Sequence, residues 1–592
     1  FYDYGIGPAQ YETPEGAVAG EIKIKRQYVI ENGKLLSVFD TGIHIGDEML
    51  RRMLDRHADD RMKNIVSTIQ QEQNRIIRDE AHRVLIVQGS AGSGKTSAAL
   101  QRIAYLLYKH RKTLDADRVL LFTPNDIFQN YVSSVLPELG ESNVPQSTFH
   151  EMTVHLLGSG FRVEHPYDHL ERKLTGEADS VQAGRTERTA LDFLKKIDAY
   201  VESLEKTGMQ FVPMTAGQRV LVDAEAMSRY FYEMVGTKPM RARFEAMKEW
   251  LAETVRTYRS DAERRIRAKL LKEPSYIGTD DEIRAMAKQK ANKRAAKLMK
   301  WVKQGRFIDR VGLYVRFLGN DPAADRIAEG EVPYEETAAL LYFLHKLEGL
   351  PAFGQIRYVL VDEVQDYSPM QIALIKHLFP RSRMTFLGDL NQSVFGESGL
   401  TDYRTFTECF GTEDVGLLRL TKSYRSTQDI LDFCRGILPE GAEHAEAYGR
   451  RGEKPALHRF EAKEEMLAAI AERIARLQEE GMGSIAVICR TERDAREAYE
   501  RLEQRLPLRL ITRESRQLDV SRPLVIPSYM AKGLEFDAVI VYDGSAETYG
   551  GQHDRKLLYT VCTRALHRLD VFCTGEASPF LPAEIAAGNL QG

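Results

Sequence analysis

The sequence predicts an α/β protein with two parallel-sheet domains, a mainly helical inserted arm and a short N-terminal β-hairpin. Three observations support this fold class. Short apolar runs of β-prone residues alternate with amphipathic helical segments in two parts of the chain, as in parallel βαβ units. A long stretch with a helical period interrupts the first of these patterns. At 592 residues the chain is also too long for one hydrophobic core, so several domains are expected.

The first predicted element is the β-hairpin. Residues 21–38 alternate apolar and polar side chains on both sides of Asn32 and Gly33, a pair that suits the positive φ angles of a two-residue hairpin turn. We therefore assign residues 1–60 to this hairpin and a linker. Because the sequence starts at Phe1, inside a stretch that reads as structured, we expect a further segment before it.

The first α/β domain is expected at residues 61–150 and 336–412, on either side of the inserted arm. The period becomes helical from about residue 60, and apolar strands then follow in βαβ order. These strands are predicted at residues 83–88, 118–124, 358–362 and 384–389. A second α/β domain is expected at residues 413–592, with the strand candidates SIAVICR, PLVIPS, DAVIVYD and LDVFCTG.

The inserted arm, expected at residues 151–335, is helical and locally basic. Between Lys238 and Arg306 there are 20 Lys or Arg residues against 9 Asp or Glu, although the whole chain has a formal net charge of −4. Apolar residues at Ala291, Ala295, Leu298, Met299 and Val302 recur at spacings that predict long amphipathic helices. The charge fits either a solvated helical surface or a surface that contacts nucleic acid, and composition does not choose between them.

Composition excludes several other classes of protein. The five cysteines lie in the second half without CxxC spacing, so neither a disulfide framework nor a zinc site is indicated. They read as small apolar residues in a reducing compartment. No apolar run reaches the roughly 18 to 20 residues of a membrane span, and no signal peptide is recognisable. We therefore expect a cytoplasmic protein without a membrane partner.

A phosphate-binding loop is predicted where the first domain begins. The segment GSAGSGKT fits the pattern GxxxxGK[ST] and follows a predicted strand at the start of a predicted helix. Its glycines allow backbone N–H groups to surround phosphates, while Lys95 is expected to reach the β- and γ-phosphates of ATP and Thr96 to bind Mg²⁺. The alternative, a glycine-rich turn without a ligand, rarely matches this pattern in this context. The predicted nucleotide-binding residues are Gly89, Ser90, Ala91, Gly92, Ser93, Gly94, Lys95 and Thr96.

Two adjacent carboxylates end another apolar strand, in the segment IRYVLVDEVQDYSP. Asp362 is expected to hold Mg²⁺, and Glu363 to accept a proton from, or orient, the water that attacks the γ-phosphate. Acidic pairs are common on exposed surfaces, but a pair that ends an apolar strand in a chain with a phosphate-binding loop predicts ATP hydrolysis. A small-molecule kinase would need neither the second α/β domain nor a water-activating Glu.

The order of the motifs resembles that of superfamily 1 helicases of the UvrD, Rep and PcrA kind. The segment DEVQD is similar to their motif II. The remaining motifs occur in family order as the Q motif IQQEQNRII, motif Ia LLFTPN, motif Ib STFH, motif III GDLNQSVF, motif IV KSYRST, motif V AKGLEFDAVIV and motif VI LLYTVCTRA. The resemblance implies two RecA-like P-loop domains that share one ATP site. It assigns Gln73 to the adenine, Tyr424 to stacking on it and Glu535 to the ribose. It also places three side chains near the γ-phosphate, namely Gln392, Arg425 and Arg564.

The two arginines come from the second domain and would bind phosphates held by the first. Such charge-assisted bonds form only when the cleft closes on ATP, so hydrolysis would release them. Taken singly, Arg425 or Arg564 could equally be a surface salt-bridge partner, and Tyr424 could be a core residue. Only the paired motifs favour the nucleotide role.

The chain departs from the UvrD-like pattern on its nucleic-acid side. Motif III continues with Gly396 and Glu397 where those helicases have an aromatic residue that stacks on a base, and motif V has Pro527 and Tyr529 in place of Thr and His. An aromatic stack contributes about 1 to 3 kcal/mol per base, whereas a carboxylate repels phosphate. About 100 residues separate motifs IV and V, too few for the second large accessory domain of those helicases.

This combination resembles the HelD family, UvrD-like ATPases that associate with bacterial RNA polymerase. The similarity includes the segments FYDYG, MKNIVSTIQQEQNRIIR and YEETAALLYFLHKLEG. It implies that the arm enters the main channel of the polymerase, and that ATP-driven domain movement helps the enzyme to release nucleic acid and be recycled. Two other hypotheses stay open: a DNA helicase or translocase of repair type, and a scaffold that binds ATP without hydrolysing it.

Overall fold

The structure, a computed structural model, separates the chain into two compact units. The first comprises residues 1–152, 165–179 and 353–592, and the second residues 153–164 and 180–352. The second unit therefore extends past residue 335, where the sequence placed the end of the arm, and residues 165–179 belong to the first unit. The residues that the structure describes are 7–13, 16–24, 26–31, 34–40, 71–139, 141–176, 189–272, 279–350, 353–396, 399–439, 446–447, 451–515, 518–582 and 586–587.

Two antiparallel strand pairs precede the α/β part of the first unit. Strand β3 (Arg26–Glu31) pairs with β4 (Lys34–Asp40) as predicted, on either side of Asn32 and Gly33, which lie outside the described residues. Strand β1 (Gly7–Thr13) pairs with β2 (Gly16–Ile22), a hairpin that the sequence analysis did not predict.

A six-stranded parallel sheet forms lobe 1, which we define as residues 71–152 and 353–420. Its strand order is β14-β5-β13-β12-β6-β7. The bounds are β5 Val84–Gly89, β6 Val119–Phe122, β7 Gln146–Ser147, β12 Tyr358–Val361, β13 Arg383–Gly388 and β14 Val415–Leu420. All four predicted strands are present. The sheet also includes β14, so it extends past residue 412, the expected boundary, because a strand's own sequence does not reveal which sheet it joins.

Helices cover both faces of this sheet because its strands are apolar on both sides. Helices α3 (Lys95–Lys109) and α4 (Asp126–Glu138) share a buried core with Leu387 of β13. The preceding residue of β13, Phe386, has its side chain on the other face of the sheet. There it contacts Phe406 of α16 (Arg404–Phe410), which lies beside α15 (Pro369–Leu378). The carboxyl ends of β5, β13 and β12, which are neighbours in the sheet, therefore meet at one edge.

A seven-stranded parallel sheet forms lobe 2, which we define as residues 421–582. Its strand order is β19-β20-β18-β21-β22-β17-β23, where β23 (Ala586–Ala587) lies beyond the lobe's last residue. The other bounds are β17 Ala456–Phe460, β18 Ile485–Cys489, β19 Arg509–Leu510, β20 Leu524–Pro527, β21 Phe536–Val541 and β22 Ala565–Thr574. Its main helices are α17 Gln428–Ile437, α18 Lys463–Glu479, α19 Glu492–Leu502 and α20 Asp554–Cys562. The four strand candidates are confirmed, and the α/β fold with two parallel sheets is the predicted fold class.

The second unit is mainly helical. Its helices are α8 Leu191–Leu204, α9 Ala224–Arg229, α10 Met240–Leu271, α11 Asp280–Lys303, α12 Arg310–Leu318, α13 Pro322–Ala328 and α14 Thr337–Glu348. A small antiparallel pair joins β9 (Met214–Ala216) to β10 (Arg219–Val222). Helix α5 (Phe149–Leu157) begins in the first unit and ends in the second. Within the described ranges, no helix is long and apolar enough to cross a membrane.

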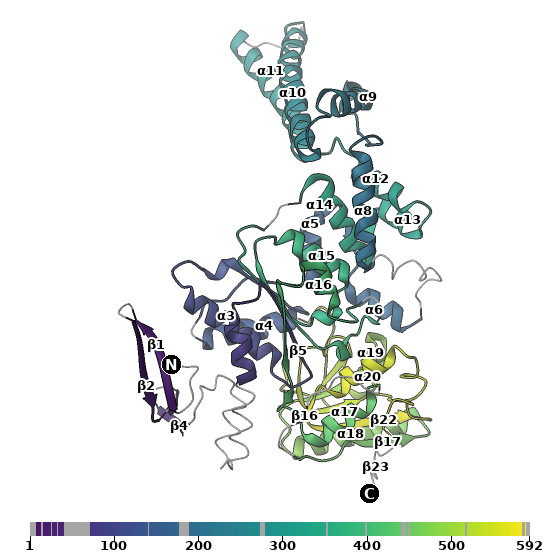
Figure 1. Ribbon diagram of the computed structural model, residues 1–592. Coiled ribbons are helices and arrows are strands. Elements are labelled where there is room, and N and C mark those ends of the chain that lie inside the picture. The colour runs from purple at the N-terminus through teal and green to yellow at the C-terminus, as the bar shows by residue number, and fades with distance from the viewer. Residues whose placement is uncertain are drawn as a thin grey trace. The chain divides into compact units, whose positions relative to one another are not determined.

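The two longest helices of this unit lie side by side as a hairpin (Figure 1). Thr279 starts α11 with a capping box: its hydroxyl accepts from the N–H of Glu282, whose carboxylate accepts from the N–H of Thr279. The predicted apolar positions Ala291, Ala295 and Val302 are buried. The small alanine side chains between α10 and α11 allow the two helices to approach closely. Most of the remaining surface of α11 is exposed.

Candidate nucleotide-binding site

The loop between β5 and α3 has the geometry of a phosphate cradle. Gly92 and Gly94 have φ angles of 68° and 82°, which L-residues with a side chain rarely adopt. A Cβ at Gly92 would meet the Ser423 hydroxyl at 2.7 Å, and one at Gly94 would collide with Tyr424. Gly94 is also the N-cap of α3 and offers no side-chain acceptor, so the N–H groups of the first helical turn are left for an anion.

Lys95 and Thr96 start α3, and their side chains contact this loop and the end of β12. The Lys95 ammonium is buried and donates to the backbone carbonyls of Gly89 at 2.6 Å and Ser90 at 3.2 Å. Thr96 donates its hydroxyl proton to a carboxylate oxygen of Asp362 at 2.9 Å. The predicted lysine, hydroxyl and Mg²⁺-binding carboxylate thus lie around one point at the edge of the sheet.

Asp362 and Glu363 follow β12 in a strained turn. Glu363 has a left-handed backbone with φ 52°, and its N–H donates to the Asp362 carboxylate at 2.9 Å. Burial, together with the neighbouring charge of Glu363, raises the pKa of Asp362 to about 6. Burial also raises the pKa of Glu363, but the positive charges of Lys532, Lys95 and Arg564 outweigh it and hold this pKa below its ordinary value. The two neighbours therefore differ in charge at mildly acidic pH.

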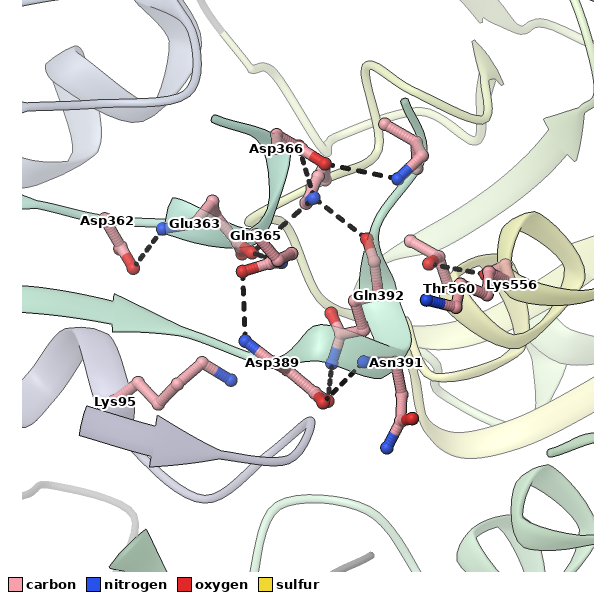
Figure 2. Close-up of polar contacts among 12 residues, drawn as sticks. Lys95, Asp362, Glu363, Gln365, Asp366, Asp389, Asn391, Gln392, Lys556 and Thr560 are labelled. Atoms are coloured by element: carbon pink, nitrogen blue, oxygen red, sulfur yellow. Dashed lines mark hydrogen bonds and ion pairs between the residues drawn. The ribbon is translucent and has the colours of Figure 1, made fainter. Parts of the chain in front are cut away.

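A second buried acid, Asp389, follows β13 and organises motif III (Figure 2). Its carboxylate accepts from the side chain of Gln392 at 2.9 Å and from the N–H of Asn391 at 3.1 Å. The side-chain oxygen of Gln365 accepts from the N–H of Asp389 at 3.0 Å, while its amide donates to Glu363 at 2.6 Å. Gln365 thereby links the turn after β12 to the turn after β13.

Lys532 of lobe 2 reaches into these turns of lobe 1. Its ammonium forms an ion pair with Asp366, lies 3.8 Å from the carboxylate of Glu363 and donates to the backbone carbonyl of Gln392 at 2.9 Å. Lys532 is only 2% exposed, so this charge has been taken out of water and depends on these partners.

The two predicted arginines of lobe 2 also reach lobe 1. Arg564 is buried and donates to the side-chain oxygen of Gln392. Arg425 donates to the hydroxyl of Ser97 on α3 at 2.9 Å and forms an ion pair with Glu535 at 2.8 Å. Both guanidinium groups therefore contact both lobes. Glu535, which the resemblance assigned to the ribose, is here the partner of Arg425.

Gln73 and Tyr424, the residues assigned to the adenine, lie together. The Gln73 amide is 3.5 Å from the Tyr424 hydroxyl, and both side chains are fully buried. Helix residues 71–78, which carry Gln73, are anchored to α3 because Arg102 donates to the carbonyls of Ile76 and Asp79, each at 2.6 Å. The side-chain oxygen of Gln73 has no hydrogen-bond partner among the described residues. A buried acceptor without a donor is costly, and an amino group of a base would satisfy it.

The residues present suit ATP with Mg²⁺. The described residues contain no cluster of three or more His, Cys, Asp or Glu side chains that could form a self-contained metal site. Mg²⁺ bound with a nucleotide needs only one or two protein oxygens, because phosphates and water supply the remainder. Thr96 and Asp362 offer these two oxygens beside the phosphate cradle. The individual roles of all the site residues stay predictions.

Sequence reasoning missed three side chains that complete this site. Lys532 lies within AKGLEF, a segment recognised only as a motif, and its partner Asp366 is 166 positions away. Asp389 could have been found by the signal that identified Asp362, because it is an acidic residue directly after an apolar strand. Gln365 carried no signal of its own in the sequence.

Comparison with protein families shows what this arrangement is similar to. The sequence pattern of the UvrD/REP helicase N-terminal domain matches residues 69–399, more than half of the chain. Patterns of the UvrD-like helicase C-terminal domain match residues 418–518 and 524–571. Together these matches include both lobes and the insertion.

Individual relatives are similar over parts of their length. The ATP-dependent DNA helicase UvrD1 of Mycobacterium leprae is 22% identical over 421 residues, which are 68% of this chain and 42% of that protein. The ATP-dependent DNA helicase srs2 of Schizosaccharomyces pombe is 32% identical over 105 residues, 17% of this chain and 12% of that protein. The ATP-dependent DNA helicase PcrA of Leuconostoc citreum is 26% identical over 158 residues, 25% of this chain and 21% of that protein. The chain thus matches less than half the length of each.

Replacing Asp362 by Asn should stabilise the ligand-free protein at pH 8. The folded-state pKa of about 6 is above the ordinary value of 3.8, so folding disfavours the charged carboxylate. The increase in the free energy of unfolding that Asn gives is therefore absent below about pH 4 and grows between pH 4 and 6. It is complete above pH 6, where it amounts to about 3 kcal/mol. Urea unfolding without Mg²⁺ at pH 5 and pH 8 measures it.

Asp402→Asn is the matched control, because its exposed partner Arg404 lowers the pKa of Asp402. That variant should gain nothing at pH 8. An Asp362→Asn protein that is no more stable than the parent at pH 8 would show that the Asp362 carboxylate is not held at a raised pKa.

Proposed function

Since this chain belongs to the UvrD/Rep helicase family, we propose that it is an ATP-hydrolysing motor that remodels bacterial RNA polymerase, promoting the release of nucleic acid and the recycling of the enzyme. One observation carries the motor: Lys95, Asp362 and Glu363 lie at the end of the lobe 1 sheet, and Arg425 and Arg564 of lobe 2 contact their neighbours Ser97 and Gln392 there. Each of these groups has a use in phosphoryl transfer to water.

The residues divide the chemical work. The N–H groups of the loop and the Lys95 ammonium hold the phosphates and balance their charge. Bound Mg²⁺, held by Thr96 and Asp362, would further neutralise charge on the phosphate oxygens. Glu363 has a lowered pKa, so it is an ionised acceptor that can orient a water molecule or take its proton. Burial of this cluster strengthens every one of these electrostatic interactions.

Closure of the cleft would depend on the γ-phosphate. Arg564 contacts Gln392, and Gln392 contacts Asp389 of lobe 1, so this chain of contacts joins the lobes close to the phosphate cradle. A γ-phosphate offers Arg425 and Arg564 charged acceptors that ADP lacks. Hydrolysis would therefore remove these charged contacts and weaken the attraction between the lobes, and the resulting movement can be passed to a partner.

The positions that differ from the strand-contacting residues of the related helicases support a motor that does not bind a nucleic-acid strand at this surface. Tyr529, which stands where the related helicases have His, is buried and donates to a carboxylate oxygen of Glu171 at 2.8 Å. Glu171 lies on α6 (Pro166–Leu174) and also accepts from the N–H groups of Glu492 and Arg493 at the start of α19, at 2.9 and 3.0 Å. Lys173 of α6 donates to the carbonyl of Phe395 in lobe 1 at 3.1 Å. Glu397 lies outside the described residues.

The polymerase is proposed on the resemblance to HelD proteins. One of the segments that carry this resemblance, YEETAALLYFLHKLEG, lies apart from the ATP motifs and forms η5 (Tyr334–Glu336) and α14 of the second unit. Tyr529 is buried against Glu171 and is therefore covered at a position where the related helicases contact a strand. This agrees with a partner that is chiefly protein.

A DNA helicase or translocase is the second candidate. It is favoured by the family match and by the names of the relatives, each of which is called a DNA helicase. Strand separation of a tailed DNA duplex by the purified protein and ATP would distinguish it from the polymerase remodeller.

Glu363→Gln should lower the rate of phosphate release from ATP by a factor of about 100 or more, because the acceptor for the attacking water is lost. ATP binding should persist, since the change removes a negative charge near the phosphates. A phosphate-release assay, together with titration of a fluorescent ATP analogue, measures both quantities.

Glu472→Gln, an exposed change on α18, should leave the rate unchanged. Equal rates for the intact chain and Glu363→Gln would exclude this mechanism. If the intact chain binds ATP but releases no phosphate, it is an ATP-binding scaffold.

The intact chain should co-elute with purified bacterial RNA polymerase on size exclusion, and the complex should survive nuclease treatment because the main contact is with protein. Adding ATP should speed the dissociation of labelled nucleic acid from the polymerase, and Glu363→Gln should not. Co-elution that disappears with nuclease would contradict a protein partner.

A further inference from the structure

The exposed surface of α11 carries an unusual density of positive charge. From Ile283 to Arg306 the sequence has nine basic residues and no acidic one. All nine are exposed. They are Arg284, Lys288, Lys290, Lys293, Arg294, Lys297, Lys300, Lys303 and Arg306.

Four of these residues form a straight stripe. Lys290, Lys293, Lys297 and Lys300 follow one another at spacings of three and four, so they lie on one face of the helix. The buried residues Ala291 and Ala295 face α10, which places the stripe on the side away from that helix. At 1.5 Å per residue the stripe is about 15 Å long, and the whole of α11 about 36 Å. We name these four residues the lysine stripe.

The basic side chains of α11 differ from those of α10, several of which are paired. No basic side chain between Ile283 and Arg306 forms an ion pair with any described residue. On α10, Lys248 pairs with Glu245 at 2.7 Å, Arg264 with Asp261 at 2.5 Å, and Arg267 with Asp280 of α11 at 3.1 Å. Arg256 is paired with Glu253 as well. A surface kept basic only for solubility would gain from similar pairs, so the unpaired face of α11 is available to an external anion.

The neighbours of the stripe distinguish between kinds of anionic partner. The other exposed side chains of α11 beyond Ile283 are Ala, Gln and Asn, and no large hydrophobic side chain is exposed there. The cores of protein interfaces are enriched in aromatic residues and depleted in Lys. Phosphate backbones, in contrast, are contacted by Lys, Arg, Gln and Asn without any apolar core. A helix of this length also matches about one turn of a nucleic-acid duplex.

We propose that the exposed face of α11 binds the phosphate backbone of duplex nucleic acid through the lysine stripe, without reading its sequence. This gives the arm of the proposed motor a ligand of its own, and it requires neither ATP hydrolysis nor a polymerase. The contact is set by charge, so it should weaken steeply with salt and be indifferent to base composition.

The test is fluorescence anisotropy of the full chain with a labelled 20-base-pair DNA of random sequence, without ATP, at several salt concentrations. Replacing all four lysines of the stripe by Gln should reduce the slope of log K against log salt by about 3 to 4, since each phosphate contact contributes about 0.9. At low salt the affinity should fall by a factor of about 100 or more. Gln keeps a high helix propensity, so the helix should persist, and circular dichroism checks this.

The matched control removes four paired charges from α10, by changing Lys248, Arg256, Arg264 and Arg267 to Gln. It lowers the net charge equally but should change the slope by less than 1. Replacing the stripe by four Arg residues should restore the slope of the parent, which separates loss of charge from loss of folding.

Three results would overturn the proposal. The first is equal effects of the stripe and control variants, which would indicate general attraction by net charge. The second is no detectable binding of the duplex by the intact chain at low salt. The third is competition by polyglutamate that equals competition by unlabelled duplex at matched charge, which would assign the stripe to an acidic protein. None of these results depends on ATP turnover or polymerase binding, so this experiment can contradict the lysine-stripe proposal without contradicting the proposed function, and the reverse also holds.

Discussion

The buried ammonium of Lys532 fixes the relation of the two lobes, because it has left water and must keep its carboxylate partners. Those partners, Asp366 and Glu363, belong to the turn after β12 of lobe 1. That turn is held in place by Gln365, which links it to Asp389 after β13. Removing one member of such a buried pair typically costs about 3 to 5 kcal/mol. The docking of lobe 2 is therefore coupled to the positions of the groups that would hold phosphate and water.

The contacts of other cations in the two lobes suggest how a nucleotide would act as a switch under the proposed function. Lys95 donates to carbonyls of its own loop and Arg564 to the side-chain oxygen of Gln392, so these two cations have neutral partners. Phosphates offer these cations charged acceptors, which form stronger hydrogen bonds than neutral ones. Only the γ-phosphate distinguishes ATP from ADP, and under the proposed function the groups near Gln392 would sense it. The proposed function thus relates a small chemical change to the contacts between two lobes.

Local sequence predicted most of the fold and the part of the site that is local in the chain. The apolar runs that became β5, β12, β13, β18 and β21 have strand length and neighbouring helices, and GSAGSGKT predicted its loop because the residues that form it are contiguous. Sheet membership was less predictable, since β14 joins β5 through pairing that its own sequence does not encode. Lys532 was missed because its partner lies in the other lobe. The left-handed turn at Glu363 was missed because nothing in a Glu residue signals a positive φ.

The account depends on a cleft whose closure responds to the γ-phosphate. Spin labels at Lys112→Cys on lobe 1 and Gln504→Cys on lobe 2, both exposed, would report the distance between the lobes. With Mg²⁺ and a non-hydrolysable ATP analogue we expect one narrow distance distribution, and with ADP a broader distribution at different distances. Arg564→Gln should bind the analogue but lose the narrowing. Identical distributions with the analogue and with ADP in the parent protein would contradict the central claim.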